Sequence, residues 1–168
     1  LHISGLRRQI GRIAHAFYGN PCSEMRVVGV TGTNGKTTTV HFIAQLADQL
    51  GLKAARIGTL GVSVDAEKII ESDRTTPDAI TLASIFAALR DKGVNFVAME
   101  VSSHALDQGR VDGIPFTVGL MTNLTRDHLD YHQTMEAYGE AKARFFRDFD
   151  LQAAVFNIDD TFCRTMSE

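Results

Sequence analysis

Two kinds of hydrophobic pattern alternate along the chain. Short apolar runs, several of them rich in β-branched residues, predict strands at residues 26–30, 53–60, 61–64, 94–99, 116–122 and 153–156. Between the runs, helical spacing predicts three amphipathic helices. The buried face of the first holds Val40, Ile43, Leu46, Ala47 and Leu50, and that of the second holds Leu82, Ile85, Phe86 and Leu89. The third helix spans residues 134–149. Residues 65–76 are polar and predict a loop. Strands that alternate with helices indicate an α/β fold with a mostly parallel sheet and helices on both faces.

The first 24 residues differ from the rest of the chain. Leu6, Ile10, Ile13 and Phe17 recur at helical spacing with three arginines on the opposite side, and Pro21 follows the segment. We interpret this amphipathic helix either as one packed on the domain or as the tail of a preceding domain. Residues 25–168 then form the main domain.

A glycine-rich segment joins the first strand to the helix that follows it. Its sequence, Thr-Gly-Thr-Asn-Gly-Lys-Thr-Thr, spans residues 31–38. Gly32 and Gly35 allow positive φ, so that backbone N–H groups and the positive end of the next helix can face a phosphate. Lys36 is expected to bring its charge to the β- and γ-phosphates of a nucleotide, and Thr37 to bind Mg²⁺ through its hydroxyl. Val30 replaces the first glycine of the common phosphate-loop motif, but the order of strand, turn, Lys-Thr and helix is kept.

Composition and charge narrow the function classes. The 168 residues are 44% hydrophobic and 22% charged, with a formal net charge of −3, which is typical of one globular domain and gives no reason to expect a nucleic-acid partner. Cys22 and Cys163 are too few for a disulfide framework or a metal cluster, and they fit a reducing compartment. No apolar run approaches the length of a membrane span, so we expect a cytoplasmic protein without a membrane partner.

Polar side chains follow the predicted strand 94–99, at the edge of a parallel sheet where ligands bind. Glu100 comes directly after this strand and is expected to hold Mg²⁺, directly or through water. Ser102 can either cap the next helix or bind a ligand. Arg110 is a candidate fork for a carboxylate, although a surface arginine is the more common explanation for a lone arginine.

The segment Thr75-Thr76-Pro77-Asp78 has two interpretations. Thr76 as N-cap, Pro77 at the first helical position and Asp78 in the first turn would make a favourable helix start. The hydroxyls and free N–H groups of such a start also suit a carboxylate or a phosphate.

Two histidines follow the predicted strand 116–122. His128 and His132 lie four residues apart with acids between them, which allows a zinc site, although a third soft ligand is not evident. His128 could instead complete the ligands of a second Mg²⁺.

Lys142 occupies an unusual place in the predicted helix 134–149. It falls on the apolar stripe that also holds Met135, Tyr138, Phe145 and Phe149. A lysine at the edge of such a stripe usually extends its amine to solvent. The alternative is a functional lysine in a pocket, where reaction with CO₂ would turn its positive charge into a negatively charged carbamate that can bind Mg²⁺.

Together these segments resemble the central domain of the Mur ligase family. Five stretches carry the resemblance in the family's order, at residues 31–38, 75–77, 99–111, 122–132 and 138–142. The loop alone would also fit the wider superfamily that includes folylpolyglutamate synthase. The runs Ser-Ser-His-Ala-Leu at 102–106 and Arg-Asp-His-Leu-Asp-Tyr-His at 126–132 are more specific, and they are most similar to members that add the third residue to UDP-MurNAc-L-Ala-D-Glu.

The resemblance implies a role for each matching residue. It assigns the ATP phosphates to Gly32, Thr33, Asn34, Gly35, Lys36, Thr37 and Thr38, magnesium to Thr37, Glu100, His128 and carboxylated Lys142, and the UDP-MurNAc-dipeptide to Thr75, Thr76, Ser102, Gln108 and Arg110. The expected catalytic residues are Lys36, Glu100, His128 and Lys142. Arg74 departs from the small polar residue that related sequences often carry at its position.

The activity that the resemblance implies is ATP-driven amide formation through an acyl phosphate, with Mg²⁺ as cofactor. The implied substrates are UDP-MurNAc-L-Ala-D-Glu and a diamino acid, meso-diaminopimelate rather than L-lysine. The resemblance covers about residues 25–160, so 1–24 are expected to be the tail of an N-terminal domain or a linker helix, and the central domain to be cut short at its C-terminal end. The fragment is expected to be inactive alone and the intact enzyme to be monomeric. A folylpolyglutamate synthase-like ligase and a nucleotide-binding module without catalysis stay open as alternatives.

Overall fold

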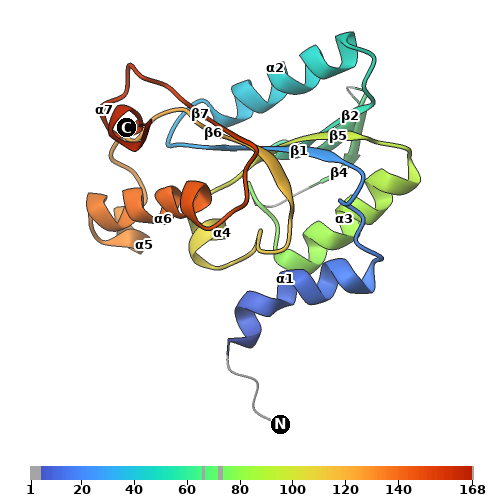
Figure 1. Cartoon of the computed structure of the whole chain (residues 1–168), viewed down its shortest axis with the longest axis horizontal. Coiled ribbons are helices and arrows are strands. Elements are labelled where there is room, and N and C mark those ends of the chain that lie inside the picture. Colours follow the sequence, from blue (N-terminus) through green and yellow to red (C-terminus); the bar gives the residue numbers. More distant parts are fainter. Residues whose placement is uncertain (1–4, 66, 72–73, 168) are drawn as a thin grey trace.

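The computed structural model describes residues 5–65, 67–71 and 74–167. Its strands form one sheet in the order β4-β3-β2-β5-β1-β6-β7 (Figure 1). They span Arg26–Thr31 (β1), Ala54–Gly58 (β2), Gly61–Val64 (β3), Glu67–Ile70 (β4), Phe96–Glu100 (β5), Phe116–Met121 (β6) and Ala153–Phe156 (β7). The neighbouring pairs β2–β5, β5–β1, β1–β6 and β6–β7 are parallel. At the other side of β2, the pairs β2–β3 and β3–β4 are antiparallel. This mostly parallel sheet confirms the predicted α/β fold class.

Helices cover both faces of the sheet. They span Leu6–Phe17 (α1), Lys36–Gln49 (α2), Ala79–Asp91 (α3), Ser103–Asp107 (α4), Leu129–His132 (α5), Met135–Arg147 (α6) and Thr161–Ser167 (α7). In Figure 1, α2 lies on one face, whereas α3, α4 and α6 lie on the other with α1 beneath α3. None of the helices in the described residues has the length and apolar composition needed to cross a membrane.

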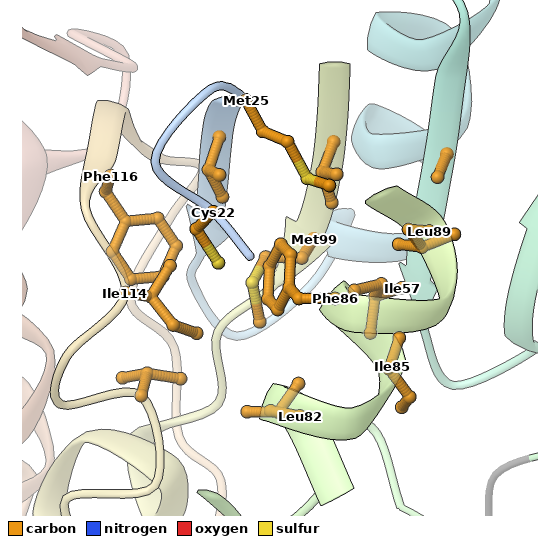
Figure 2. Packing of buried hydrophobic residues seen from close by; sticks show 14 of the residues in the cluster. Cys22, Met25, Ile57, Leu82, Ile85, Phe86, Leu89, Met99, Ile114 and Phe116 are labelled. Carbon is orange, nitrogen blue, oxygen red and sulfur yellow. The ribbon is translucent and has the colours of Figure 1, made fainter. Parts of the chain in front are cut away.

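The larger core lies between the sheet and α3. All four apolar residues predicted for the face of α3 are buried. Figure 2 shows Phe86 of α3 beside Met99 of β5, and both side chains are inaccessible to solvent. This packing holds the carboxyl end of β5, where Glu100 lies.

The face that α2 buries differs from the predicted one. Val40 and Ala47 are buried as expected, but Leu46 and Leu50 are 59% and 80% exposed. Ala44 is buried instead and joins a small core with Val30 of β1. Small side chains at this contact let the helix lie close to the sheet, and the larger leucines point away from it.

The face that α1 buries was also predicted incorrectly. Ile13 and Phe17 are 55% and 82% exposed, while Gly11, Ala14 and His15 are buried. A Cβ at position 11 would lie 1.8 Å from the carbonyl oxygen of Asp112, so glycine permits the close approach of α1 to that loop. The helix packs on the domain through small residues, in contact with α3.

The predicted loop at 65–76 is wrong in part. Glu67–Ile70 forms β4, which pairs antiparallel with β3, and Ile69 and Ile70 pack against the core. Residues 66, 72 and 73 of that loop lie outside the described part of the chain. A short edge strand of this kind depends on the neighbouring strand for its hydrogen bonds. Its four residues are too few to show the alternation of apolar and polar positions that predicts a strand.

The start of α3 also differs from the predicted one. Its N-cap is Asp78, not Thr76, because the Asp78 carboxylate accepts hydrogen bonds from the backbone N–H groups of Ile80 and Thr81, each at 3.1 Å. Thr76 is buried, and its hydroxyl donates to the backbone oxygen of Glu100 at 2.9 Å. Thr76 therefore ties the start of α3 to the end of β5.

Candidate nucleotide and metal site

The glycine-rich loop joins β1 to α2 and has the backbone conformation that its sequence predicted. The φ angles of Gly32 and Gly35 are 136° and 85°, both in the region that favours glycine. A Cβ at position 32 would lie 1.9 Å from the hydroxyl oxygen of Thr122. Gly32 is therefore needed both for its φ angle and for the close approach of the segment after β6.

The segment after β6 holds the loop from the side. The backbone oxygen of Asn123 accepts a hydrogen bond from the backbone N–H of Thr33 at 2.9 Å. The side-chain oxygen of Asn123 accepts another from the backbone N–H of Asn34 at 3.0 Å. The backbone N–H of Thr125 donates to the Thr33 hydroxyl at 3.0 Å. Asn123 and Thr125 were not singled out from the sequence, because their role depends on β1 and β6 being neighbours.

Lys36 folds back over the loop. Its Nζ donates to the backbone oxygens of Gly32 at 2.9 Å and Thr33 at 2.8 Å. Burial lowers the pKa of the Lys36 amine, while the nearby charges of Glu100 and Asp127 raise it. The amine thus lies at the centre of the loop, where it can contact a phosphate group.

Glu100 is buried at the end of β5 and faces the start of α2. Its Oε1 accepts from the Thr37 hydroxyl at 2.9 Å and from the backbone N–H of Thr59 at 2.9 Å. Its Oε2 lies 3.4 Å from the Thr59 hydroxyl. A Cβ at Gly58 would lie 2.2 Å from Oε1, so only glycine leaves room for this carboxylate at the end of β2.

Gly58 and Thr59 were missed in the sequence, where they were part of a predicted strand. The signal available was a glycine followed by a threonine at the end of an apolar run. Thr59 also donates from its hydroxyl to that of Thr75 at 3.0 Å. Thr59 therefore connects the Glu100 carboxylate with the segment predicted to contact the substrate.

The donors around Glu100 are those that Mg²⁺ prefers. Thr37 and Glu100 place a hydroxyl and a carboxylate within hydrogen-bond distance of each other beside the phosphate loop. These two residues could hold one Mg²⁺. Within the described residues, no group of three or more His, Cys, Asp and Glu side chains is arranged to hold a metal ion.

The predicted substrate residues Thr75, Thr76 and Ser102 lie next to this centre. Thr76 accepts from the backbone N–H of Ser102 at 3.0 Å, in addition to its bond to Glu100. The Ser102 side chain caps α4 by accepting from the backbone N–H of Ala105 at 3.2 Å, as one of its two interpretations predicted. The hydrogen bonds described for Thr76 and Ser102 are thus structural.

Gln108 and Arg110 form a second polar group beyond α4. Arg110 donates to the Gln108 side-chain oxygen from Nε at 2.9 Å and from Nη2 at 2.6 Å, and its Nη1 donates to the backbone oxygen of Thr76 at 3.0 Å. The Gln108 amide nitrogen donates to the Tyr131 hydroxyl at 3.1 Å. One edge of the Arg110 fork is therefore occupied by Gln108.

Lys142 is 1% exposed, which excludes a lysine that extends to solvent from the edge of the stripe. Its Nζ donates to the backbone oxygen of Gly32 at 2.9 Å and lies 4.6 Å from the centre of the Tyr138 ring. Burial and, to a lesser extent, the charge of Lys36 lower the pKa of the Lys142 amine to about 7, against the opposing effect of Asp127. Lys36 and Lys142 thus meet at the same loop carbonyl.

His128 and His132 occupy different environments. His132 is buried, and its Nε2 lies 2.9 Å from the Ser103 hydroxyl, which gives this ring a structural partner and does not favour zinc. His128 is half-exposed beside Asp127, and its ring centre lies 6.0 Å from that of Tyr138. No hydrogen bond or ion pair among the described residues joins Glu100 to His128 or Lys142, so the second metal centre stays a prediction.

Two cavities flank the phosphate loop. One of about 490 Å³ is lined on one side by Asn34, Gly35 and Asn123 and on the other by Val155 and Phe156 of β7. The other, of about 220 Å³, contains Thr37 and Glu100. A loop with phosphate-binding geometry, a neighbouring hydroxyl–carboxylate pair and adjacent cavities together suit a Mg²⁺–nucleotide complex.

Fold and site together define a nucleotide-binding α/β domain with a phosphate loop. The model of the Mur ligase middle domain matches residues 30–168, and the chain belongs to the Mur ligase family.

Curated relatives agree with this assignment. The chain is 54% identical over 160 residues to the UDP-N-acetylmuramoyl-L-alanyl-D-glutamate–2,6-diaminopimelate ligase of Xylella fastidiosa (strain Temecula1), covering 95% of this chain and 32% of that protein. It is 52% identical over 164 residues to the ligase of the same name from Xanthomonas oryzae pv. oryzae, covering 98% of this chain and 33% of that protein. The chain thus spans about a third of the length of the curated relatives it matches.

Solved structures give the same picture of the fold. A structure of a UDP-N-acetylmuramoyl-L-alanyl-D-glutamate–2,6-diaminopimelate ligase superimposes with a TM-score of 0.87 at 36% identity, covering 99% of this chain and 34% of that one. The apo form of L. casei folylpolyglutamate synthase (FPGS) superimposes with a TM-score of 0.74 at 19% identity, covering 99% and 47%. At this identity the second likeness shows the fold alone.

Proposed function

We propose that residues 25–168 are the central ATP-binding domain of a cytoplasmic amide ligase of peptidoglycan precursor synthesis. The intact enzyme, a monomer, joins meso-2,6-diaminopimelate, rather than L-lysine, to UDP-MurNAc-L-Ala-D-Glu. The arrangement of Lys36 and Thr37 at the phosphate loop, with Glu100 at the end of β5 beside them, supports the proposal most directly. The names of the relatives support the choice of substrates. Residues 1–24 are then the tail of an N-terminal domain or a linker helix.

The proposed reaction proceeds through an acyl phosphate. A carboxylate oxygen of the UDP-MurNAc-dipeptide attacks the γ-phosphorus of ATP, which forms the acyl phosphate and releases ADP. The amine of the diamino acid then attacks the acyl carbon, loses a proton and displaces inorganic phosphate. Mg²⁺, when bound, would neutralise charge on the phosphate oxygens.

This chain's residues supply position and charge in the proposed reaction. The loop N–H groups and the start of α2 orient the phosphates, and Lys36 stabilises the charge that develops on the γ-phosphoryl group. Thr37 and Glu100 would hold the metal ion beside them. Catalysis of this kind depends on positioning and electrostatics more than on proton transfer.

Lys142 is proposed to carry a carbamate in the active enzyme. Its neutral amine attacks CO₂, and loss of one proton leaves a carbamate with a single negative charge. The pKa of about 7 makes the neutral amine well populated at slightly alkaline pH. His128, Glu100 and this carbamate would then hold a second Mg²⁺. Labelled bicarbonate tests the step, because a ¹³C carbamate signal that is lost in Lys142→Met is expected.

A substrate panel on the intact enzyme tests the proposed function. ADP release that requires both UDP-MurNAc-L-Ala-D-Glu and meso-diaminopimelate is expected, with weak turnover of L-lysine and none of folate with glutamate. Release that depends on folate and glutamate would establish a folylpolyglutamate synthase-like ligase instead.

Lys36→Ala tests the role of the loop in the same assay. We expect kcat to fall by at least about 100-fold, since one preorganised contact to developing charge is typically worth about that factor. Lys53→Ala is the matched control, because Lys53 is an exposed lysine and does not line the loop. Near-normal turnover by Lys36→Ala would refute its role.

A further inference from the structure

Tyr138 joins α6 to the phosphate loop through a buried hydrogen bond. Its side chain is inaccessible to solvent, and its hydroxyl oxygen lies 3.1 Å from the hydroxyl oxygen of Thr33. Lys142, one helical turn further along α6, donates to the backbone oxygen of Gly32 at 2.9 Å. Two side chains on one face of α6 therefore contact two consecutive residues of the loop.

The hydrogen bonds of Thr33 show which of the two hydroxyls donates. Thr33 donates to the backbone oxygen of Thr125 at 3.2 Å and accepts from the backbone N–H of the same residue at 3.0 Å. A hydroxyl has one proton and two acceptor sites, so the Thr33 proton is already used and one acceptor site remains. Tyr138 therefore donates to Thr33. Burial raises the pKa of the Tyr138 phenol, although the hydrogen bond with Thr33 lowers it in part, so the phenol keeps its proton at neutral pH.

This bond fixes the part of the loop that holds Lys36. The Lys36 amine donates to the backbone oxygens of Gly32 and Thr33, the same two residues that α6 contacts. Movement of the Thr33 backbone would shift the oxygens to which this amine is bonded. A loop that is already held in one conformation loses less conformational freedom when it binds a ligand. The Tyr138 hydroxyl is therefore placed to preorganise the loop for a nucleotide.

The ring of Tyr138 also lies near two residues of the predicted second metal centre. Nζ of Lys142 is 4.6 Å from the centre of this ring, and the centre of the His128 ring is 6.0 Å from it. A positively charged amine over an aromatic face is attracted to the ring, whereas a carbamate is not. The bond from the Tyr138 hydroxyl to Thr33 does not depend on the charge of Lys142, so it can hold α6 to the loop with either form of the lysine.

We propose that Tyr138 is a positioning residue whose hydroxyl holds the phosphate loop in the conformation that binds Mg²⁺–ATP. This inference rests on the proposed function and goes beyond it. Tyr138 acts through Thr33 and is not itself a contact of the nucleotide. Its effect therefore belongs to ATP binding, and the binding of the UDP-MurNAc-dipeptide should not depend on it.

Tyr138→Phe in the intact enzyme removes the hydroxyl and keeps the ring. We expect the Kd for Mg²⁺–ATP, measured by calorimetry, to rise roughly 2- to 12-fold, the usual effect of losing one hydrogen bond, with no change in the KM for UDP-MurNAc-L-Ala-D-Glu. Tyr18→Phe is the matched control, because Tyr18 packs against Phe17 and its hydroxyl has no hydrogen-bond partner among the described residues. An unchanged Kd in Tyr138→Phe would overturn the proposal.

A double-mutant cycle tests whether the effect passes through Thr33. Thr33→Val removes the acceptor of the Tyr138 hydroxyl. Adding Tyr138→Phe to this variant should therefore not weaken the binding of Mg²⁺–ATP further, because the two substitutions break the same bond. An equal loss of affinity from Tyr138→Phe in both backgrounds would overturn the proposed route.

A variant in the core separates positioning from a loss of stability. Phe145 is a buried residue of α6 that packs against Phe116 and Phe149. Phe145→Leu should lower the midpoint of thermal unfolding and leave the Kd for Mg²⁺–ATP unchanged. Equally weakened ATP binding in this variant would show that stability alone explains the effect of Tyr138→Phe.

The wild-type enzyme distinguishes the two levels of the proposal in the same calorimetric measurement. Failure of the wild-type enzyme to bind Mg²⁺–ATP would refute the proposed function. Normal binding by the wild type that Tyr138→Phe leaves unchanged would refute the role of Tyr138 alone.

Discussion

Lys142 shows how burial changes the chemistry of one side chain. Its amine is enclosed between Tyr138 and the phosphate loop, with Lys36 nearby. A lysine whose pKa is lowered by folding binds fewer protons in the native state than in the unfolded chain. Between about pH 7 and 10.5, therefore, the unfolded state holds one more proton, and stability rises with pH.

This linkage predicts the behaviour of Lys142→Met. In bicarbonate-free buffer we expect the variant to be more stable than wild type at pH 7, because methionine carries no charge into the interior. The difference in the free energy of unfolding should shrink by up to about 1.4 kcal/mol per pH unit as pH rises toward 9. Urea denaturation at several pH values measures it. A difference that is constant with pH would contradict the lowered pKa.

Thr59 is expected to position the Glu100 carboxylate. Thr59→Val keeps the shape of the side chain and removes the hydroxyl that lies near both Glu100 and Thr75. Loss of one hydrogen bond is typically worth about 0.5–1.5 kcal/mol, so the Mg²⁺ concentration for half-maximal activity of the intact enzyme should rise roughly 2- to 12-fold. Thr59→Ser should behave like wild type.

A control separates this effect from a loss of stability. Thr165 is an exposed threonine on α7 whose hydroxyl contacts only its own helix in the described hydrogen bonds. Thr165→Val should leave the Mg²⁺ dependence unchanged. An unchanged Mg²⁺ dependence in Thr59→Val would show that its backbone N–H alone positions Glu100.

At the scale of elements, the start of α3 depends on Asp78. Burial raises the pKa of the Asp78 carboxyl group, but the hydrogen bonds that it accepts from Thr81 and Ile80 outweigh this effect and lower the pKa. We expect Asp78→Ala to cost about 0.5–2 kcal/mol in the free energy of unfolding, measured by urea denaturation at pH 7. The contribution is present above the pKa of the unfolded chain, near 4, and is lost as pH falls through the lower value of the folded protein.

Asp91 provides the matched control at the other end of α3. It is exposed and pairs with its neighbour Arg90, a surface ion pair of small expected value. Asp91→Ala should therefore change stability little. Equal losses in the two variants would show that Asp78 does not act as a cap.

The helices and strands also show how much of the fold can be predicted from local sequence patterns. Long apolar runs and regular helical spacing predicted β1, β5, β6, α3 and α6, because each carries enough periodic residues to define a face. β4 and the short helices α5 and α7 were missed, since four to seven residues give little periodicity. The buried face of α1 was assigned incorrectly and that of α2 only in part correctly, because close packing selected glycine and alanine over some of the larger apolar residues.

At the scale of the whole molecule, nucleotide binding and turnover are expected to separate. The phosphate loop and the Thr37–Glu100 pair lie within one chain, whereas the relatives are about three times longer. We expect the 168-residue chain to bind Mg²⁺–ATP in calorimetry without releasing phosphate, and the intact enzyme to do both. Phosphate release by the chain alone with both substrates would contradict the proposal that it is one part of a larger ligase.

The phosphate loop is the part of the site that the sequence determined by itself. Its glycines, lysine and threonine are consecutive, and their φ angles and hydrogen bonds follow from local geometry. The position of Glu100 could be predicted equally well, because an acidic residue directly after a buried parallel strand must lie at the carboxyl edge of the sheet. Lys142 could also be recognised in the sequence, as a charged residue on the apolar face of a predicted helix.

Only the tertiary structure decided which residues support that machinery. Strand order brought Thr59 to Glu100 and Asn123 to the loop. These partners are separated by tens of residues, and nothing in their local pattern distinguishes them from other polar residues. Contacts of this kind arise from the way elements pack, whereas the loop and the strand ends are specified by neighbours along the chain.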